Sequence, residues 1–243
     1  MMFKISKDIP LTGYTLVIPT VSVGNVAQLA VDLLIETLKL NKIGLLWHPA
    51  LIPVVGPPAF DHDVDKITTT AELFASEHRK LLVLQIRAPL VGALQSDFLD
   101  ELTVFVQDRQ LAEIIVLSSS FAHENHQIGA RPYKYLANEP FLSGNAETLQ
   151  ALQWAVLEGN VIHGGGYATK LLDACSEKQL ACFILFNYVS EGDNRADAVQ
   201  LVSLLDKLKT PLFPRESDGV QIKLAIPSSW KHLFGNSAPV NVY

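Results

Sequence analysis

Short runs of aliphatic and β-branched residues alternate along the chain with longer stretches of helical periodicity. The run from Thr15 to Pro19 is apolar at almost every position, which predicts a buried strand. From residue 26 to residue 40 apolar residues recur at helical spacing, and Asn25 before them suits an N-cap. The run from Lys42 to His48 predicts a second strand. Strand, helix and strand with short connections predict a parallel crossover unit.

The same alternation continues through the rest of the chain. We expect further strands over 81–86, 113–117 and 182–186, and helices over 97–107, 167–177 and 194–208. Such alternation is typical of a mostly parallel sheet with helices on both faces. The sequence therefore predicts an α/β fold, a three-layer α/β/α sandwich. We expect a single domain over residues 1–243, with a flexible carboxyl-terminal tail at about 236–243.

Composition narrows the classes of function. The net charge of −6 disfavours nucleic acid as a partner, because phosphate binding needs clustered Lys and Arg. The longest apolar runs are far shorter than the roughly 20 residues of a membrane-spanning helix, and the first residues lack the apolar core of a secretion signal. We expect a cytoplasmic protein, with the nucleus as a further location. With 49% hydrophobic residues, the chain has enough apolar surface for a core and a partner-binding face.

Two stretches interrupt the alternation. Residues 49–71 contain four prolines and a glycine, which predicts an irregular excursion. Residues 121–154 are polar and mixed, and we expect at most helical pieces there. Long loops in compact domains are often functional, so both stretches are candidate contact surfaces.

Glycines and serines offer the first candidate sites. His163 and the triple glycine Gly164–Gly166 open a predicted helix, where free amides can bind phosphate, but the run has neither Walker nor dinucleotide spacing. A tight turn beside a neighbouring segment is the favoured interpretation. The serines Ser118–Ser120 follow a strand, and with His123 and His126 they suggest a Ser–His hydrolase. They lack the Gly-x-Ser-x-Gly elbow, so a capping role is favoured.

The remaining polar groups are incomplete as catalytic or metal sites. His123 and His126 supply only two ligands, and an acidic run after the proline-rich segment is more simply a solvated turn. The run Glu191–Asn194 between a strand and a helix suits an N-cap better than acid–base chemistry. Cys175 and Cys182 form neither a disulfide framework nor a zinc pattern. We therefore expect no catalytic residue, no metal and no cofactor. The acidic run comprises Asp61, His62, Asp63 and Asp65.

Six motifs in order carry a family resemblance. They lie between Gly13 and Gly235 and so span nearly the whole chain. Together they resemble the motifs of the proteasome assembly chaperone 2 family. Each motif alone is unspecific, but the set in this order is specific. The motifs are Val21–Val26, Ile115–Ser120, Gly164–Gly166, Val189–Asn194, Ile226–Trp230 and Leu233–Gly235.

The resemblance implies a binding protein. Members of the family pair with proteasome assembly chaperone 1, and the heterodimer binds α-type subunits of the 20S proteasome. It promotes α-ring formation and prevents off-pathway ring dimers, without catalysis or cofactor. The family's three-layer fold is similar to that of nucleoside phosphorylases. The alternative is therefore a nucleoside phosphorylase-like or hydrolase-type enzyme acting on a small molecule, with Ser118–Ser120, His163 and the glycines at its site.

The resemblance also implies a role for the carboxyl terminus. The family's tail ends in a hydrophobic residue, Tyr and one further residue, and inserts between adjacent α-subunits. Here the chain ends at Val242 and Tyr243, so the final residue is missing and Tyr243 itself carries the carboxylate. One extended residue spans about 3.3–3.6 Å, enough to displace the charge or the ring. We expect Val242 and Tyr243 to contact a partner; a plain terminus, with the partner's tail as anchor, is the alternative.

Overall fold

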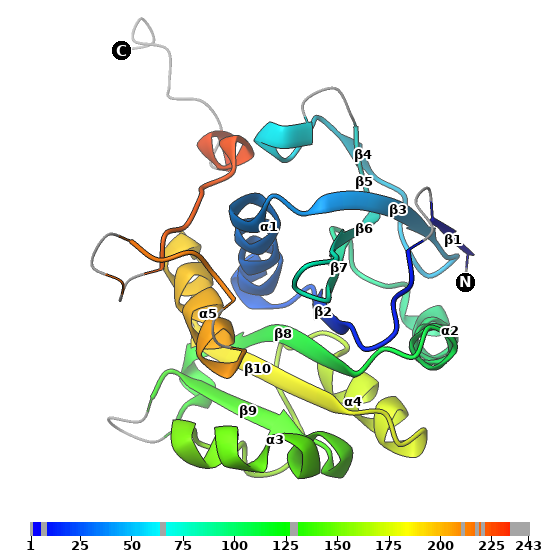
Figure 1. The fold of residues 1–243 in the computed structure, drawn as a ribbon. Helices are drawn as coiled ribbons and strands as arrows, with labels where there is room; N and C mark the ends of the chain where they lie inside the picture. Colours follow the sequence, from blue (N-terminus) through cyan, green and yellow to red (C-terminus); the bar gives the residue numbers. More distant parts are fainter. Residues whose placement is uncertain are drawn as a thin grey trace, which may run out of the picture.

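An eight-stranded sheet forms the centre of the computed structural model, which describes residues 2–5, 9–63, 67–126, 131–209, 212–216, 219 and 222–233 (Figure 1). The strands run in the order β1-β3-β6-β7-β2-β8-β10-β9. Their bounds are β1 (Met2–Ile5), β2 (Thr15–Pro19), β3 (Asn41–Trp47), β6 (Ala71–Ser76), β7 (Leu81–Ile86), β8 (Glu113–Phe121), β9 (Tyr133–Ala137) and β10 (Cys182–Val189).

The sheet is mixed, which corrects the prediction of a mostly parallel one. The pairs β7–β2, β2–β8 and β8–β10 are parallel, whereas β1–β3, β3–β6, β6–β7 and β10–β9 are antiparallel. The reason lies in the short connection 77–80 between β6 and β7, because a connection of that length joins only antiparallel strands. The predicted crossover is also modified, since β6 and β7 lie between β2 and β3.

Helices cover both faces of the sheet, as predicted. Along β8, Ile115 and Leu117 pack with α1, α3 and α5, whereas Ile114 and Val116 pack with α2 and α4. This alternation follows from the two-residue period of a strand. Figure 1 shows α1 and α5 on one side of the sheet and α2 and α4 on the other. The helices are α1 (Val26–Leu38), α2 (Gln95–Asp108), α3 (Glu139–Leu152), α4 (Ala168–Glu177) and α5 (Arg195–Leu208).

The helix ends have local causes. α1 ends at Lys39, which has φ 49° and donates its backbone N–H to the carbonyls of Glu36 and Ile35. α3 begins at Asn138, whose side chain accepts a hydrogen bond from the N–H of Phe141. α3 confirms that the stretch 121–154 holds a helical piece, whereas the strand β9 in the same stretch was not predicted.

The excursion between β3 and β6 carries little regular structure, as expected from its prolines. It contains a two-stranded ribbon of β4 (Val55–Gly56) and β5 (Thr68–Thr69). Short 3₁₀ turns occur here and elsewhere, namely η1 (Val23–Asn25), η2 (Asp61–Asp63), η3 (Gly92–Leu94), η4 (Ala122–Glu124) and η5 (Ser228–His232).

Some predictions fall outside these ranges. The tail with Val242 and Tyr243, and Asp65 of the acidic run, lie outside the described residues. Among the helices that the structure describes, none is long and apolar enough to cross a membrane.

Candidate functional site

Four of the sequence motifs meet at the carboxyl ends of the central strands. The turn η1 follows β2, the serines end β8, and the turn 190–194 follows β10. The glycine run joins them from a distant part of the chain, because the N–H of Val23 donates to the carbonyl of Gly164 over 3.3 Å. This is the edge at which open α/β sheets usually bind ligands.

The serines lie inside β8 and not beyond it, because the strand extends to Phe121. Ser118 accepts a hydrogen bond from the hydroxyl of Thr20 (2.9 Å) and donates to the carbonyl of Gly165 (3.1 Å). The hydroxyl of Ser120 donates to the carbonyl of His163 over 2.9 Å. Both serines therefore bind the glycine run to the sheet.

Ser119 binds the other loop. Its hydroxyl donates to the carbonyl of Val23 over 2.6 Å, so the 2.7 Å contact with Ser22 must be a hydrogen bond that Ser22 donates. A serine nucleophile needs a base that takes its proton, and these hydroxyl protons point at backbone carbonyls. The geometry therefore favours the structural interpretation of the serines over the hydrolase one.

The glycines are required by close packing of the loops. Gly164 has φ +76°, and a Cβ there would lie 2.4 Å from Cγ2 of Val23 and 2.9 Å from the ring of Phe121. Gly24 has φ +64°, and its Cβ would lie 2.4 Å from Oδ1 of Asn194. Both positions lie in the left-handed region that favours glycine. The tight-turn interpretation of the glycine run is thus confirmed, and loops of the chain itself pack closely at this edge.

The histidines gather around one carboxylate. The Nε2 atoms of His123, His126 and His163 lie 3.6 Å, 3.9 Å and 3.9 Å from the carboxylate oxygens of Glu124. All three rings are exposed. Within the part of the chain that the structure describes, no group of three or more His, Cys, Asp or Glu is arranged to hold a metal ion.

Asp61 and His62 of the acidic run are exposed in the turn η2, in agreement with the predicted solvated turn, and both are attached to α1. The backbone N–H of Asp61 donates to Oε2 of Glu36 over 3.1 Å. The ring of His62 reaches the same oxygen (3.2 Å) and the carbonyl of Leu40 (3.1 Å). A hydrogen bond from Ser228 lowers the pKa of Asp61. The run therefore joins α1 to η5.

The run Glu191–Asn194 precedes α5 as predicted. Asn194 occupies the N-cap position, but its Nδ2 donates back to the carbonyl of Ser190 over 2.8 Å. Asp193 makes the hydrogen bonds at the start of the helix. Its carboxylate accepts one from the backbone N–H of Arg195 (3.2 Å) and another from the guanidinium of Arg195. The hydrogen bond from that side chain lowers the pKa of Asp193. The helix start is thus stabilised by Asp193, not by an amide cap.

The two cysteines are free and buried on α4 and β10. A hydrogen bond with Cys175, together with burial, raises the pKa of the Cys182 thiol well above its ordinary value.

Since only the thiolate reacts, a disulfide reagent such as DTNB should modify the cysteines of the native protein at least ~100-fold more slowly than those of the urea-unfolded protein. Absorbance of released thionitrobenzoate measures both rates, and rapid modification of the native chain would contradict the buried placement.

Apolar side chains are exposed at the end of β3 and on the excursion between β3 and β6. Trp47 is 63% exposed, Val55 72% and Ile67 60%. The excursion is held beside β3, because the backbone N–H of Val54 donates to Oγ1 of Thr70 (2.7 Å). Thr70 directly precedes β6, the strand that pairs with β3. Grouped exposed apolar side chains mark interaction sites, whereas single ones do not. We define the apolar patch as Trp47, Ile52, Val54, Val55 and Ile67.

The sequence analysis predicts a candidate contact surface in this excursion but does not identify the residues of the patch. The prolines supplied the signal for irregular structure. The exposure of Trp47 and Ile67 depends on how β3 and the β4–β5 ribbon pack against the rest of the protein. The local spacing of apolar residues carries no information about that packing.

The mixed sheet with helices on both faces defines an α/β protein, a fold class that by itself does not set a function, and the exposed apolar patch is the kind of surface that marks an interaction site. Comparison with known sequences agrees. The chain belongs to the PAC2 family, whose model matches residues 16–212.

Curated relatives extend over nearly the full length. The chain is 33% identical to the Proteasome assembly chaperone 2 of Homo sapiens, with 94% of each chain covered. It is 26% identical to the protein of the same name from Saccharomyces cerevisiae, covering 90% of this chain and 94% of that one. The chain is therefore a homologue of proteasome assembly chaperones.

Solved structures show the same fold. Pyrococcus furiosus PbaA, described as an archaeal homologue of proteasome-assembly chaperone, matches with a TM-score of 0.68 at 15% identity, covering 85% of this chain and 84% of that one. PbaB from the same organism, described as an archaeal proteasome activator, matches with a TM-score of 0.65 at 18% identity, covering 87% and 92%. At these identities the likeness concerns the fold alone.

Proposed function

We propose that this chain is a chaperone for assembly of the 20S proteasome and acts as one half of a heterodimer with proteasome assembly chaperone 1. The observation that carries the proposal is the likeness to human Proteasome assembly chaperone 2 over 94% of both chains. The heterodimer binds α-type subunits, promotes α-ring formation and prevents off-pathway ring dimers. It acts in the cytoplasm and the nucleus.

The proposal gives the chain one α/β domain over residues 1–243, and the residues expected to form its tail, about 236–243, lie outside the described residues. Val242 and Tyr243 are the proposed tail contacts with a partner. The apolar patch supports a further contact on the folded body. Large aromatic side chains dominate binding energy when they become buried in an interface, and Trp47 is the largest side chain of the patch.

Polar replacement of the patch should weaken partner binding without unfolding the protein. For a Trp47→Ser, Val55→Ser double variant we expect the Kd for proteasome assembly chaperone 1 to rise at least ~10-fold, because loss of a central aromatic contact costs about 2 kcal/mol or more. The free energy of unfolding should change by less than ~0.5 kcal/mol per site, since both side chains are exposed. Isothermal titration with the separately purified partner measures the Kd, and urea unfolding measures the free energy of unfolding.

The matched control is a Val104→Ser, Val161→Ser double variant, which removes exposed valines outside the patch. It should bind the partner like the wild type. Equal weakening in both variants would refute the patch as the contact. Failure of the wild-type chain to capture either chaperone 1 or an α-type subunit would refute the proposed function itself.

The alternative, a nucleoside phosphorylase-like or hydrolase-type enzyme, receives less support. It would use the hydroxyls of Ser118–Ser120, and each of them donates to a carbonyl of a neighbouring loop. A thermal shift of the protein with nucleosides plus phosphate would support that alternative.

A further inference from the structure

The apolar patch has an open face on the excursion between β3 and β6. Val55 and Ile67 lie close together there, because Gly56 pairs with Thr68 in the ribbon of β4 and β5. Both side chains are exposed, and so is Trp47 at the end of β3. Exposed apolar side chains that are grouped in this way are stabilised when another apolar segment covers them. A segment that covers the patch must be apolar and must lie within reach of the excursion.

The turn η5 lies against the same excursion. Figure 1 shows η5 beside η2. The hydroxyl of Ser229 in η5 donates to the carbonyl of Ala59 over 2.9 Å. Trp230 is buried and belongs to the same core cluster as Phe60. The residues that follow η5, 234–243, therefore start from a position that is fixed on the excursion.

The ten residues 234–243 are long enough to reach the patch. Leu233, the last described residue, is four residues from Ser229, and Val55 is four residues from Ala59. Four residues span at most about 14 Å, so Leu233 and Val55 both lie near the contact between Ser229 and Ala59. Ten extended residues span about 33–36 Å. The segment can therefore extend over the patch from its fixed start.

The tail has the chemistry that an apolar surface selects. Residues 234–243 contain no charged side chain. Val240 and Val242 are two residues apart, so both project from one face of an extended chain, and Tyr243 adds an aromatic ring. Pro239 restricts the residue before it to extended backbone, which lowers the entropy cost of docking. An extended tail thus presents an apolar face.

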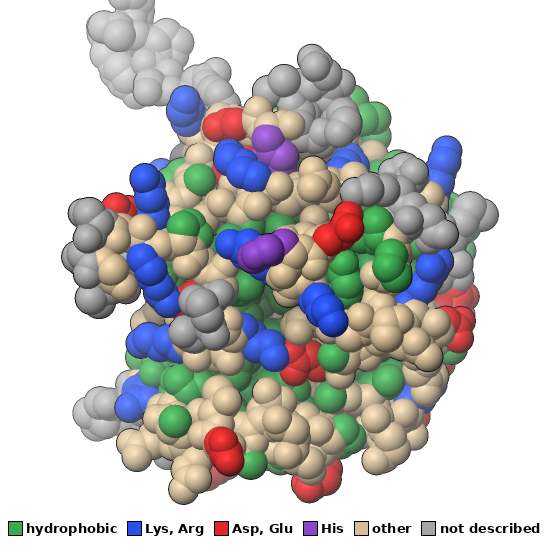
Figure 2. All heavy atoms as spheres, in the orientation of Figure 1, with side chains coloured by type: hydrophobic (Ala, Val, Ile, Leu, Met, Phe, Trp, Pro, Cys, Tyr) green, Lys and Arg blue, Asp and Glu red, His purple; other side chains and the backbone are tan. Residues whose placement is uncertain are grey.

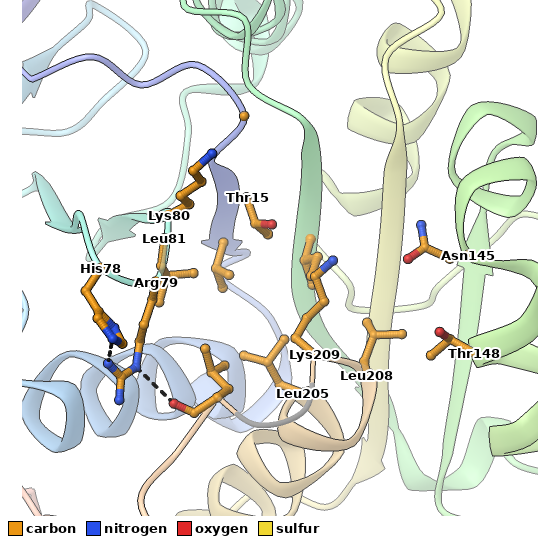
Figure 3. Close-up of a pocket in the computed structure, with 14 residues that line it drawn as sticks. Thr15, His78, Arg79, Lys80, Leu81, Asn145, Thr148, Leu205, Leu208 and Lys209 are labelled. Atoms are coloured by element: carbon orange, nitrogen blue, oxygen red, sulfur yellow. Dashed lines mark hydrogen bonds between the residues drawn. The ribbon is translucent and has the colours of Figure 1, made fainter.

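The pocket beside the β6–β7 turn is a poor site for this tail. It has a volume of about 550 Å³, but Val17 and Ile115 in its wall are fully buried and offer no apolar surface. Figure 2 shows Lys, Arg and His side chains around this turn. Lys80 and Arg79 point to opposite sides of the turn (Figure 3). An uncharged apolar tail would have to cover these charges at the cost of their hydration, so the patch is the favoured site.

We propose that in the free protein the tail at 236–243 folds back and covers the apolar patch of its own chain. Val240, Val242 and Tyr243 contact the patch around Val55. Attachment to the same chain gives the tail a local concentration on the order of millimolar, so even a weak contact is populated. A partner that binds the patch must displace the tail, which frees Tyr243 for its own partner contact. This regulatory role rests on the proposed function, whereas the contact itself does not.

Chemical crosslinking locates the tail in the full chain. Val55→Cys with Asn241→Cys places one thiol in the patch and one in the tail, and the native cysteines are buried. A short bismaleimide should join this pair within one chain at least ~5-fold faster than it joins Ile226→Cys with Asn241→Cys. Ile226 is exposed and close to Asn241 along the chain, so an unattached tail would meet it more often. Mass spectrometry of the monomer measures both rates.

Substitutions in the tail distinguish a specific contact from chance encounters. Adding Val240→Ser and Val242→Ser should lower the crosslinking rate at Val55 to that of the Ile226 pair, whereas Asn236→Ser should leave it unchanged. Equal rates for the Val55 and Ile226 pairs would overturn the proposal. A crosslinked dimer that grows with protein concentration would also overturn it, because the tail would then belong to a second copy.

Trp47 provides a second measurement that needs no added cysteine. It is exposed, whereas Trp154 and Trp230 are buried, so acrylamide quenching reports mainly on Trp47. Val240→Ser with Val242→Ser in the full chain should raise the quenching constant by about 1.5-fold or more, because the uncovered patch becomes more populated. An unchanged constant would contradict coverage of the patch.

Capture of chaperone 1 is measured separately from the tail contact. A chain that captures chaperone 1 but shows no contact between tail and patch would lose this inference and keep the proposed function. A chain that shows the contact but captures neither chaperone 1 nor an α-type subunit would keep the contact and lose the proposed function.

Discussion

Replacing Gly164 with alanine should lower the free energy of unfolding by about 3 kcal/mol. The left-handed backbone at φ +76° costs an alanine about 1–2 kcal/mol. The new Cβ would stand 2.4 Å from Cγ2 of Val23 and 2.9 Å from the ring of Phe121, and overpacking of that kind costs about 1–3 kcal/mol. The two loops that these residues connect must separate to relieve the contact. Urea unfolding followed by circular dichroism measures the change.

Gly144 provides the matched control. It lies in α3 with nothing within 4 Å of an added Cβ. Alanine there should stabilise the helix by about 0.5–1 kcal/mol, because alanine is the better helix former. Glycine to alanine should therefore lower the free energy of unfolding at Gly164 and raise it at Gly144. A Gly164→Ala variant as stable as the wild type would show that the loops are not closely packed.

Replacing Asp32 with alanine should destabilise the protein by about 4 kcal/mol. Asp32 lies on α1, and its carboxylate accepts hydrogen bonds from Nη1 and Nη2 of Arg87 (3.2 and 2.9 Å) and from Nε2 of Gln85 (2.6 Å). The side chain of Arg87 is only 20% exposed and lies over the ring of Phe60 at 5.7 Å. Removing the carboxylate leaves a mostly buried cation without its counter-charge, and such a loss typically costs about 3–5 kcal/mol.

A double variant distinguishes the lost charge from lost packing. In Asp32→Leu, Arg87→Met both charges are replaced by apolar side chains, and we expect most of the stability to return, to within about 1–2 kcal/mol of the wild type. Replacing Arg87 by Met alone should remain costly, because Asp32 would then be the unpaired charge. Additive effects of the two substitutions would contradict a direct pairing of Asp32 with Arg87.

Elements with a strong local pattern could be predicted from the sequence. The strand over Thr15–Pro19 has the predicted bounds, and α1 over Val26–Leu38 ends two residues before the predicted end. β7 over Leu81–Ile86 also has its predicted bounds. In each case the length of the apolar run distinguishes strand from helix, since the two strands have 5 and 6 residues and the helix has 13.

The strand β6 could not be predicted from its local pattern, because a charged residue lies inside its apolar run. β6 contains Glu72, which is buried and paired with Lys42 of β3. A carboxylate in the middle of a short run lowers its resemblance to a strand, and its partner is 30 residues away in the sequence. Because β6 was missed, the antiparallel β6–β7 hairpin was missed too, and with it the mixed character of the sheet.

The candidate site was predictable by residue type but not by contact. Glycines that need positive φ and serines that follow a strand core are visible as motifs. Their partners are not, since Ser119 binds Ser22 across 97 residues and Ser118 binds Gly165 across 47. The pocket beneath the β6–β7 turn has the same cause, because it combines side chains from β2, β7, β8, α3 and α5.

The position of β2 between β7 and β8 governs how the chain folds during synthesis. Thr15 and its neighbour Glu113 are 98 residues apart, so at about 5–20 residues per second a ribosome needs roughly 5–20 s between making the two. For that time the apolar β2 is without one of its two neighbouring strands. Sheets with such distant pairings fold slowly. A nascent chain stalled before residue 113 would expose an open, apolar strand edge, which is a template for pairing with another chain until β8 emerges.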